Sequence, residues 1–314
     1  MKKSSQKVLV ILGPTATGKS DLAVKLAKKF NGEVISADSR QVYKGLDIGT
    51  GKITKKEMCG IPHHLLDIAS PKTNFNIAKW QKLANKKILE IFSRNKLPII
   101  CGGTGFYIDA VTKGIILPEV LPNKKLREKL ENKTASELCN ILKKLDPNIL
   151  KSIDVNNPVR LIRAIEIAKK LGRVPSIKIQ KPKFEILNIG LKLDDKILRE
   201  NINKRLKKRI SGGMIQEAVN LHKKGLSYKR MNELGLEYRY LAMYLQNKQP
   251  LKASSGSITI SKDEMIEKLQ FEIWHYAKRQ MTWFKRDKSI NWFNPNDKAT
   301  ETLVSKFLTR KPEK

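Results

Sequence analysis

The 314-residue sequence predicts an α/β fold, in which helices flank a parallel sheet and a small all-helical insertion interrupts the chain. Two observations favour the sheet: residues 7–114 alternate short β-branched apolar runs with helical periodicity, and a glycine-rich loop joins the first run to the first helix. The insertion is predicted by helical patterns that follow one another from about residue 119 to 183 without a strand pattern between them. We therefore expect a core domain of residues 1–118 and 184–314 and a helical domain of residues 119–183.

Each predicted strand is a short apolar run that ends at a glycine or an aspartate. The predicted strands are Lys7–Leu12, Glu33–Ala37, Leu97–Cys101 and, after the insertion, Phe184–Leu193. Ligands of open parallel sheets bind beyond the carboxyl ends of the strands. We therefore expect residues 13–20, 38–41 and 102–105 to face one crevice.

Helix start and stop signals mark the rest of the chain. Asn76–Arg94 carries the apolar stripe of a helix that faces the core. In the insertion, Thr134 begins a capping box, Pro158 occupies a first helical position and Gly172 stops that helix. The remainder after residue 193 reads as helical, with a long helix that starts at the capping box of Ser261 and runs to about residue 286.

The charge of the chain points to a polyanionic partner. Lysine and arginine number 63 against 30 acidic residues, which gives a formal charge of +33. Nucleic acid is the favoured partner ahead of membrane lipid, and a lysine-rich solvated surface is the simpler alternative.

The cysteines and the apolar runs indicate the cellular compartment. Cys59, Cys101 and Cys139 are odd in number, far apart and outside any C-x-x-C spacing, so they indicate neither a disulfide framework nor a zinc site. No run approaches the roughly 18 apolar residues of a membrane span. We expect a cytoplasmic, monomeric protein with no membrane partner.

The strongest motif follows the first predicted strand and opens the first helix. It matches G-x-x-x-x-G-K-[ST], the signature of a P-loop NTPase-like core, and consists of Gly13, Pro14, Thr15, Ala16, Thr17, Gly18, Lys19 and Ser20. Its backbone N–H groups would converge on phosphate oxygens, Lys19 would add a positive charge and Ser20 would offer a hydroxyl to Mg²⁺. The alternative is a glycine-rich turn that only ends a strand.

Two polar residues follow the next strands. No apolar strand ends in a clear magnesium-ligating aspartate, and the nearest acid is Asp38, which could orient a metal-bound water or accept a proton. A turn cap in Asp38-Ser39-Arg40 is the equally common role. Thr104, in Gly102-Gly103-Thr104-Gly105, could donate to a phosphate oxygen, although capping of the next helix is the more frequent function.

Other basic and histidine residues give weaker signals. Arg160 and Arg163 lie on one side of the helix that Pro158 begins, where phosphodiester contact and a solvated face are equally compatible with the spacing. A late helix carries a mixed stripe of His275, Arg279, Trp283 and Arg286. The run Lys204–Arg209 reads most simply as a solvated helix face. His63, His64 and His222 lack companions for a metal site.

These motifs, in this order, resemble those of the bacterial tRNA dimethylallyltransferase family. The resemblance spans residue 8 to about residue 286 and rests on the strings Gly13–Ser20, Ala37–Thr50, Pro62–Asp67, Gly102–Tyr107, Asn157–Ala164 and Ala277–Gln280. Small departures are Ser20 in place of the more usual threonine and Gly51 where alanine is common, while Gly105 and Phe106 lie in a variable stretch.

The resemblance implies transfer of a dimethylallyl group from dimethylallyl diphosphate to N6 of adenosine 37, beside the anticodon of tRNAs that read U-initial codons. Asp38 would be the base, Thr104 a donor to the bridging oxygen, and Arg279 a further diphosphate ligand beside the loop and Mg²⁺. The anticodon stem-loop would contact Asp38, Ser39, Arg40, Gln41, Thr104, Arg127, Val159, Arg160, Leu161, Ile162 and Arg163.

Two alternatives remain from the residues themselves. A small-molecule or nucleoside kinase shares the P-loop but does not explain the charge or the region around Asp38. A nonenzymatic RNA-binding ATPase explains both charge and loop but leaves Asp38 and Thr104 without a function.

Overall fold

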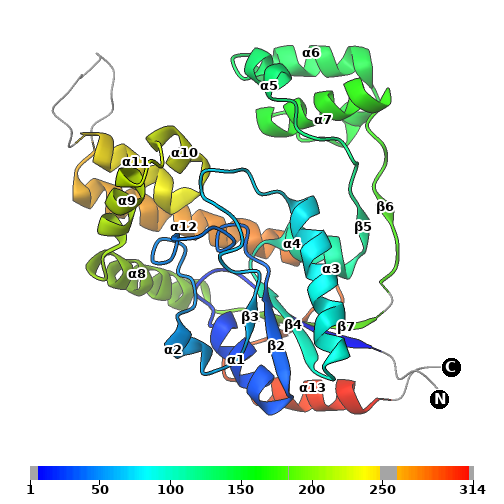
Figure 1. Cartoon of the computed structure of the whole chain (residues 1–314), viewed down its shortest axis with the longest axis vertical. Helices are drawn as coiled ribbons and strands as arrows, with labels where there is room; N and C mark the ends of the chain where they lie inside the picture. Colours follow the sequence, from blue (N-terminus) through cyan, green and yellow to red (C-terminus); the bar gives the residue numbers. More distant parts are fainter. Residues whose placement is uncertain (1–5, 183, 248–259, 311–314) are drawn as a thin grey trace. The chain divides into compact units, whose positions relative to one another are not determined.

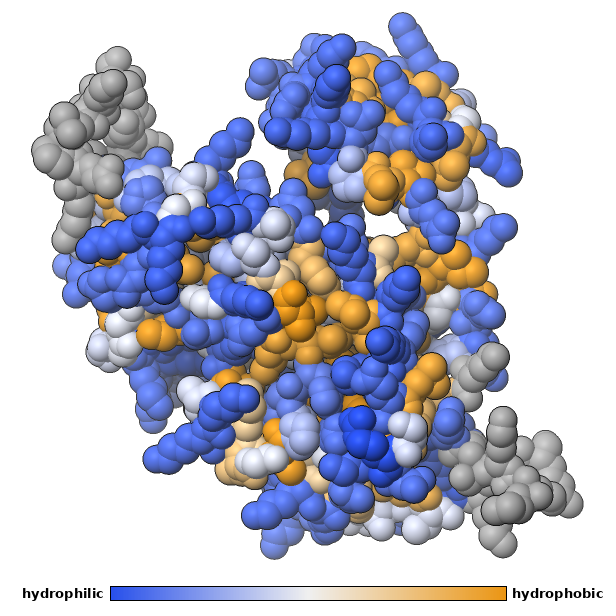
Figure 2. Space-filling model, in the orientation of Figure 1, coloured by the Kyte–Doolittle hydropathy of each residue, from blue (hydrophilic) through white to orange (hydrophobic). Residues whose placement is uncertain are grey.

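The computed structural model describes residues 6–182, 184–247 and 260–310. The chain forms two compact units, one of Met1–Thr112 with Pro182–Lys314 and a second of Lys113–Lys181 (Figure 1). On the face drawn in Figure 2, hydrophilic residues cover much of each unit and apolar areas interrupt them.

The first unit is built on a six-stranded sheet whose paired strands all run parallel, in the order β3-β2-β4-β1-β7-β8. The strands are β1 (Lys7–Leu12), β2 (Gly32–Ser36), β3 (His63–His64), β4 (Leu97–Gly102), β7 (Glu185–Leu191) and β8 (Asn291–Phe293). The predicted parallel sheet is confirmed, and β1 is central because Leu9 pairs with Ile99 of β4 and Leu187 of β7.

Both edge strands of this sheet were missed by the sequence pattern. The expectation that the chain after residue 193 is purely helical is wrong at β8, and β3 is only two residues long. Short edge strands carry too few residues for a period-2 pattern, and their pairing partners are distant in sequence.

Alternation along the strands gives the sheet two buried faces. Leu9 and Ile11 of β1 pack on one face with α1 (Lys19–Lys29) and α13 (Ala299–Thr309). Val8 and Val10 pack on the other with α3 (Ile77–Ser93) and α4 (Gly105–Thr112). Each such fully buried aliphatic side chain contributes about 1.5–3 kcal/mol, so the strands are fixed in register by the apolar contacts on both faces.

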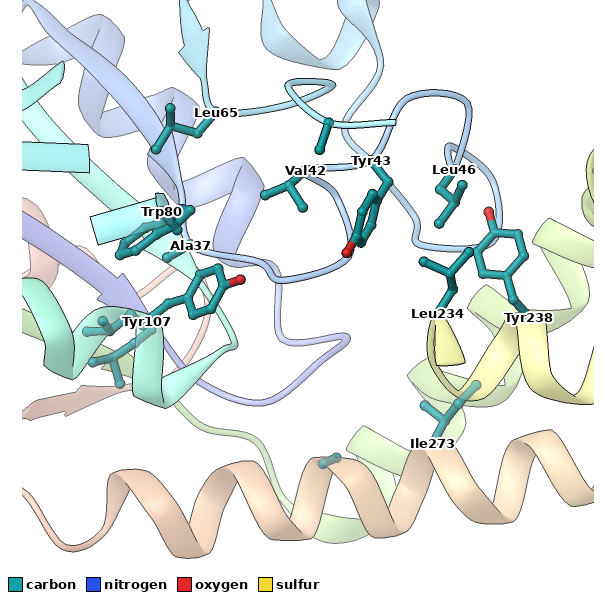
Figure 3. Close-up of a cluster of buried hydrophobic side chains, with 14 of the residues drawn as sticks. Ala37, Val42, Tyr43, Leu46, Leu65, Trp80, Tyr107, Leu234, Tyr238 and Ile273 are labelled. Atoms are coloured by element: carbon teal, nitrogen blue, oxygen red, sulfur yellow. The ribbon is translucent and has the colours of Figure 1, made fainter. Parts of the chain in front are cut away.

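A helical lobe continues the second of these cores. It consists of α8 (Asp195–Ser211), α9 (Met214–Lys223), α10 (Tyr228–Glu233), α11 (Leu236–Asn247) and α12 (Lys262–Phe284). The short helix α2 (Lys55–Met58) lies outside the lobe, in the connection from β2 to β3. Figure 3 shows the junction, where Val42, Tyr43 and Leu46 lie between Trp80 and Tyr107 near the sheet and Tyr238 of the lobe. The lobe and the sheet therefore share one apolar core.

The second unit contains α5 (Lys124–Leu130), α6 (Ala135–Leu145), a 3-10 turn (Ile149–Lys151) and α7 (Pro158–Leu171) around its own apolar cluster. The capping box at Thr134, the first-turn Pro158 and the left-handed Gly172 are all present as predicted. The expectation of a purely helical insertion is wrong at one point: β5 (Ile115–Ile116) pairs antiparallel with β6 (Lys178–Ile179). This ladder forms where the entering and leaving segments run beside each other, a contact that no local pattern encodes.

Candidate active site

The glycine-rich loop has the left-handed backbone that phosphate binding requires. Between β1 and α1, φ is +142° at Gly13, +63° at Ala16 and +78° at Gly18. A Cβ atom at Gly13 would lie 2.5 Å from the carbonyl oxygen of Leu191, so the strand can approach only a glycine there. The loop therefore curls at the amino end of α1, where the first N–H groups of a helix have no partner within the helix and can bind an anion.

Lys19 lies over this loop. Its Nζ donates to the carbonyl of Pro14 at 2.5 Å, and the hydroxyl of Thr17 donates to the same oxygen at 2.9 Å. The pKa of Lys19 is lowered to about 8, chiefly by burial and in part by the positive charge of Arg205, while the negative charge of Asp38 acts in the opposite direction. Lys19 is still mostly protonated near pH 7, and an anion beside it would raise its pKa.

Gln280 connects the loop to the end of β4; it belongs to the string Ala277–Gln280, but the sequence pattern assigns it no role in the site. Its Oε1 accepts from the amide of Thr15 at 2.9 Å, and its Nε2 donates to the carbonyl of Gly103 at 2.8 Å. The side chain extends from α12 and is buried, and the bond to Gly103 is shielded from water while the bond to Thr15 is part-buried. The neighbouring residue Arg279 was predicted to bind the diphosphate, and both residues line the same cavity.

Asp38 follows β2 and lies in a tight turn. Its Oδ1 accepts from the amides of Arg40 at 2.8 Å and Gln41 at 3.3 Å. Asp38 therefore does cap the turn, which was one of its two expected roles. In the described part of the chain, no hydrogen bond reaches its Oδ2. One carboxylate can thus hold the turn with one oxygen and face a substrate with the other.

Thr104 lies beside Asp38. Its Oγ1 accepts from the amide of Ser39 at 3.1 Å, and its own amide donates to the carbonyl of Ala37 at 3.2 Å. Gly102 permits this approach, since a Cβ atom there would overlap the carbonyl of Ala37. The two strand ends therefore form one polar surface.

Two arginines of α8 join the site, and the expectation of a solvated face over Lys204–Arg209 is wrong for them. Arg205 reaches Thr15 Oγ1 at 3.5 Å and the carbonyl of Gly51 at 3.0 Å. Its pKa is lowered to about 10, chiefly by burial and in part by repulsion from Arg209. Helical periodicity could not reveal which charged face turns inward, because lysines and arginines surround this helix.

Most of these groups line one cavity of about 890 Å³, which we call the phosphate-loop cavity, whereas the predicted Gly13, Pro14 and Thr104 are not among its lining residues. The predicted residues that line it are Thr15, Ala16, Thr17, Gly18, Lys19, Ser20, Asp38, Ser39, Arg40, Gln41 and Arg279. The further basic residues on its wall are Lys52, Lys204, Arg205, Lys208, Arg209 and Arg239. The acidic residues on the wall are Asp21, Asp38, Asp47, Glu57 and Glu237, so the nine basic residues outnumber the five acidic ones. The cavity therefore has an excess of positive charge, which suits an anionic substrate.

Two neutral groups complete the wall. Burial raises the pKa of the Cys101 thiol to about 12, so it carries no charge near pH 7. Burial also raises the pKa of Tyr276, which keeps its phenol protonated. Neither group adds a negative charge that would oppose an anion.

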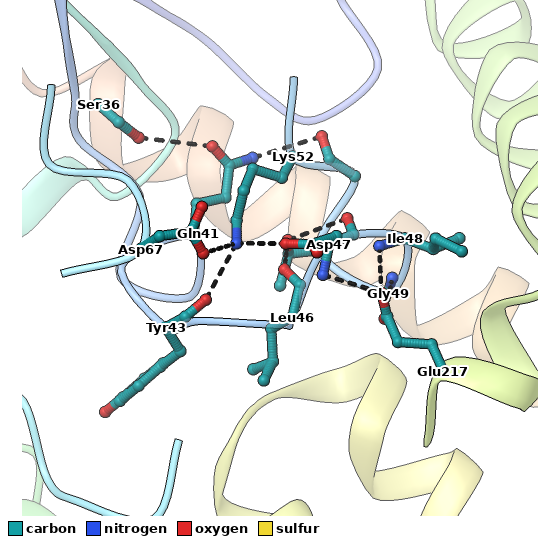
Figure 4. Close-up of polar contacts among 12 residues, drawn as sticks. Ser36, Gln41, Tyr43, Leu46, Asp47, Ile48, Gly49, Lys52, Asp67 and Glu217 are labelled. Atoms are coloured by element: carbon teal, nitrogen blue, oxygen red, sulfur yellow. Dashed lines mark hydrogen bonds and ion pairs between the residues drawn. The ribbon is translucent and has the colours of Figure 1, made fainter. Parts of the chain in front are cut away.

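The loop of residues 47–52 forms another wall of the cavity (Figure 4). Nζ of Lys52 binds the carbonyl of Tyr43 at 3.0 Å, Asp47 at 2.6 Å and Asp67 at 2.5 Å, which ties the loop to two neighbouring segments. From the helical lobe, the carboxylate of Glu217 binds the backbone of the same loop.

In the second unit, the predicted residues divide into exposed and buried ones. Leu161 and Ile162 of α7 are buried in the apolar cluster of the unit. Arg127 and Arg163 both bind the buried Glu166, and Arg163 also donates to the carbonyl of Val120. Side-chain surface for a partner is therefore offered mainly by Val159 and Arg160, which are exposed.

The remaining sequence candidates have structural partners. His64 binds the buried Glu33 at 2.7 Å, and His222 stacks on Tyr228. Trp283 donates to Asp109 at 3.1 Å and is half-buried. Among the described residues, no group of three or more histidine, cysteine, aspartate or glutamate residues could hold a metal ion. No helix within the described ranges has the length and apolarity to cross a membrane.

Fold and site together define an α/β protein of the P-loop class, in which Asp38 lines the same cavity as the glycine-rich loop. A sequence profile of the family described as IPP transferase matches residues 41–287. The chain belongs to this family, and it is an enzyme of the transferase class.

Relatives cover nearly the whole chain. It is 44% identical over 292 residues to tRNA dimethylallyltransferase 2 of Treponema denticola, with 90% of this chain and 94% of that protein covered. It is 39% identical over 315 residues to the tRNA dimethylallyltransferase of Carboxydothermus hydrogenoformans, with 97% of each covered.

Solved structures agree with the fold. The tRNA isopentenylpyrophosphate transferase of Bacillus halodurans superimposes with a TM-score of 0.68 at 36% identity, over 96% of this chain and 95% of that chain. A eukaryotic dimethylallyltransferase acting on tRNA superimposes with a TM-score of 0.80 at 26% identity, over 99% of this chain and 81% of that chain. These relatives do not support the kinase alternative.

Proposed function

We propose that this chain transfers the dimethylallyl group of dimethylallyl diphosphate to N6 of adenosine 37 in tRNAs that read U-initial codons. The observation that carries the proposal is the phosphate-loop cavity, which is lined both by the loop around Lys19 and by Asp38. The family relatives named above support the prenyl-transfer class of the reaction.

The acceptor half of the reaction depends on Asp38. The lone pair of an adenine amine is delocalised into the ring, so the amine attacks carbon readily only if it loses a proton. A carboxylate whose Oδ1 already caps the turn would accept that proton on Oδ2. The N6–carbon bond forms, the bond from carbon to the bridging oxygen breaks, and the diphosphate leaves.

The leaving-group half depends on the cationic wall. Negative charge grows on the diphosphate as its bond to carbon breaks, and preorganised donors aimed at that charge lower the barrier. The loop amides, Lys19, Arg205 and Arg279 would supply these donors. Thr104, whose hydroxyl lies beside Ser39, would donate to the bridging oxygen.

The site also fits a magnesium ion. Mg²⁺ in phosphate sites is held by one or two protein oxygens together with waters and substrate oxygens, so a large acidic cluster is not needed. Ser20 in the first turn of α1 would bind it, and the ion would neutralise charge on the diphosphate.

The RNA partner would be the anticodon stem-loop. N6 of the target base is covered in the stacked loop, so the base must turn out, at a cost of a few kcal/mol. Arg40 and Gln41 at the cavity, with Val159 and Arg160 of the second unit, are the predicted residues with exposed surface for this RNA. The proposal includes a cytoplasmic, monomeric enzyme.

One assay tests the proposal and its alternatives. The full chain is incubated with anticodon stem-loop RNA, Mg²⁺ and either dimethylallyl diphosphate or ATP, and the RNA is analysed by mass spectrometry. A gain of one five-carbon unit at the adenine supports the proposal. Phosphate transfer from ATP, or RNA binding without modification, would overturn it in favour of a kinase or a binding ATPase.

A further inference from the structure

The carboxylate of Glu217, in the first turn of α9, binds the loop of residues 47–51 from outside the phosphate-loop cavity. It accepts from three consecutive amides: Asp47 at 3.0 Å, Ile48 at 2.7 Å and Gly49 at 2.9 Å (Figure 4). Three amides that converge on one charged acceptor fix the path of the backbone more firmly than neutral side-chain bonds would.

Tyr238 supports the carboxylate from α11. Its hydroxyl donates to Glu217 Oε1 at 2.6 Å, and the ring is almost completely buried. Burial raises the pKa of Tyr238, and the adjacent negative charge of Glu217 raises it further, so the phenol stays a donor. A Cβ atom at Gly49 would lie 2.7 Å from this ring, which leaves the loop little freedom at that point.

The opposite side of the same loop holds the two arginines of the cavity. The carbonyl of Gly49 accepts from Arg209 at 3.2 Å, and the carbonyl of Gly51 accepts from Arg205 at 3.0 Å. A Cβ atom at Gly51 would overlap both guanidinium groups, so the arginines lie directly on bare backbone. The position of Arg205 is therefore set by the loop.

Arg205 has an anion-binding environment. It lies close to Thr15 of the phosphate-binding loop, and among the described residues no carboxylate forms an ion pair with it. Arg209, by contrast, is paired with Glu237 at 3.1 Å. Within the described ranges, its hydrogen bonds go to two neutral acceptors, the backbone carbonyl of Gly51 at 3.0 Å and, at the longer distance of 3.5 Å, the hydroxyl of Thr15.

We propose that Glu217 is a positioning residue for diphosphate binding: by holding the amides of residues 47–49 it places the carbonyl of Gly51, and thus Arg205, at the phosphate-loop cavity. The inference rests on the proposed function, in which that cavity binds the diphosphate. Glu217 acts through the loop, because its carboxylate binds the loop amides and the residue is not among those that line the cavity.

The test measures the affinity of the full chain for inorganic pyrophosphate in the presence of Mg²⁺, by calorimetry. Glu217→Gln keeps the side-chain size but removes the charge, and we expect it to weaken pyrophosphate binding about 10-fold. Arg205→Ala should weaken binding at least as much. If Glu217 acts through Arg205, the double variant binds no more weakly than Arg205→Ala alone, because the two losses are not additive.

Amide hydrogen exchange supplies a second readout. Exchange at residues 47–49 should accelerate in Glu217→Gln and stay unchanged in Glu200→Gln, a matched change at an exposed position of α8. Tyr238→Phe, which removes a single donor, should shift binding in the same direction by about 3-fold. It keeps the inference testable if Glu217→Gln does not fold.

The outcomes separate the inference from the function. Unchanged pyrophosphate affinity in a folded Glu217→Gln or Tyr238→Phe variant, or strictly additive losses with Arg205→Ala, would overturn the positioning role. Failure of the wild-type chain to prenylate RNA would instead overturn the proposed function, because the pyrophosphate assay contains no RNA.

Discussion

Replacement of Asp38 by asparagine separates its two functions. Asparagine retains an Oδ1 that can accept from the amides of Arg40 and Gln41, so the turn after β2 should persist. The variant loses only the carboxylate oxygen that would accept the N6 proton. A positioned general base contributes about 10²–10⁴ in rate, which corresponds to about 3–5 kcal/mol of the barrier.

The assay follows single-turnover transfer of the dimethylallyl group to stem-loop RNA and, separately, RNA affinity. We expect the rate to fall by about 10²–10⁴. RNA binding should not weaken, since the variant removes a negative charge that repels phosphates and leaves the basic side chains in place. Asp194→Asn is the matched control, because Asp194 caps the exposed start of α8 through the amide of Lys196. An undiminished rate in Asp38→Asn would refute its role as the base.

Three further predictions concern binding, pH and packing. Arg160→Ala, which removes an exposed cation of α7, should reduce the slope of log affinity for tRNA against log salt by roughly 0.7–0.9, and an identical slope would exclude a phosphate contact there. Glu33, which is buried, has its pKa lowered to about 2 by hydrogen bonds from Arg94, His64 and Lys96, which outweigh the upward effect of its burial. Its ionised form should therefore stabilise the fold fully above about pH 4.5, by up to about 3 kcal/mol, and this contribution should vanish as the pH falls toward 2. Urea unfolding of wild type and Glu33→Gln checks this, and a stability difference that does not shrink with falling pH would contradict it. Gln280→Glu replaces the donor to Gly103 by an acceptor, so pyrophosphate affinity should fall about 10-fold and stability by about 1–3 kcal/mol, and equal values for both proteins would show that this link is dispensable.

The sequence predicts an element most accurately where all the residues that define it lie close together in the chain. The loop from Gly13 to Ser20 lies between a strand and a helix, as its motif requires, and its cavity contains the predicted Asp38. Capping boxes at Thr134 and Ser261 define helix starts because the partner of each cap is only three residues away.

Long-range contacts limited the prediction. Gln280 contacts Thr15 across 265 residues, and Arg205 contacts Gly51 across 154, so the sequence pattern around each helix residue does not show the contact that it makes. Arg127 and Arg163, which were predicted to bind RNA, both bind the buried Glu166, and the sequence pattern does not show this contact.

The sequence alone determined the strand-loop-helix unit around Gly13–Ser20, the central strands of the sheet and the charge that favours an RNA partner, because each depends on near neighbours or on composition. The tertiary structure decided which of many similar cations enter the cavity and which carboxylate holds the loop that carries them. The physical reason is that desolvation and hydrogen-bond geometry select among chemically identical side chains only after distant segments have packed together.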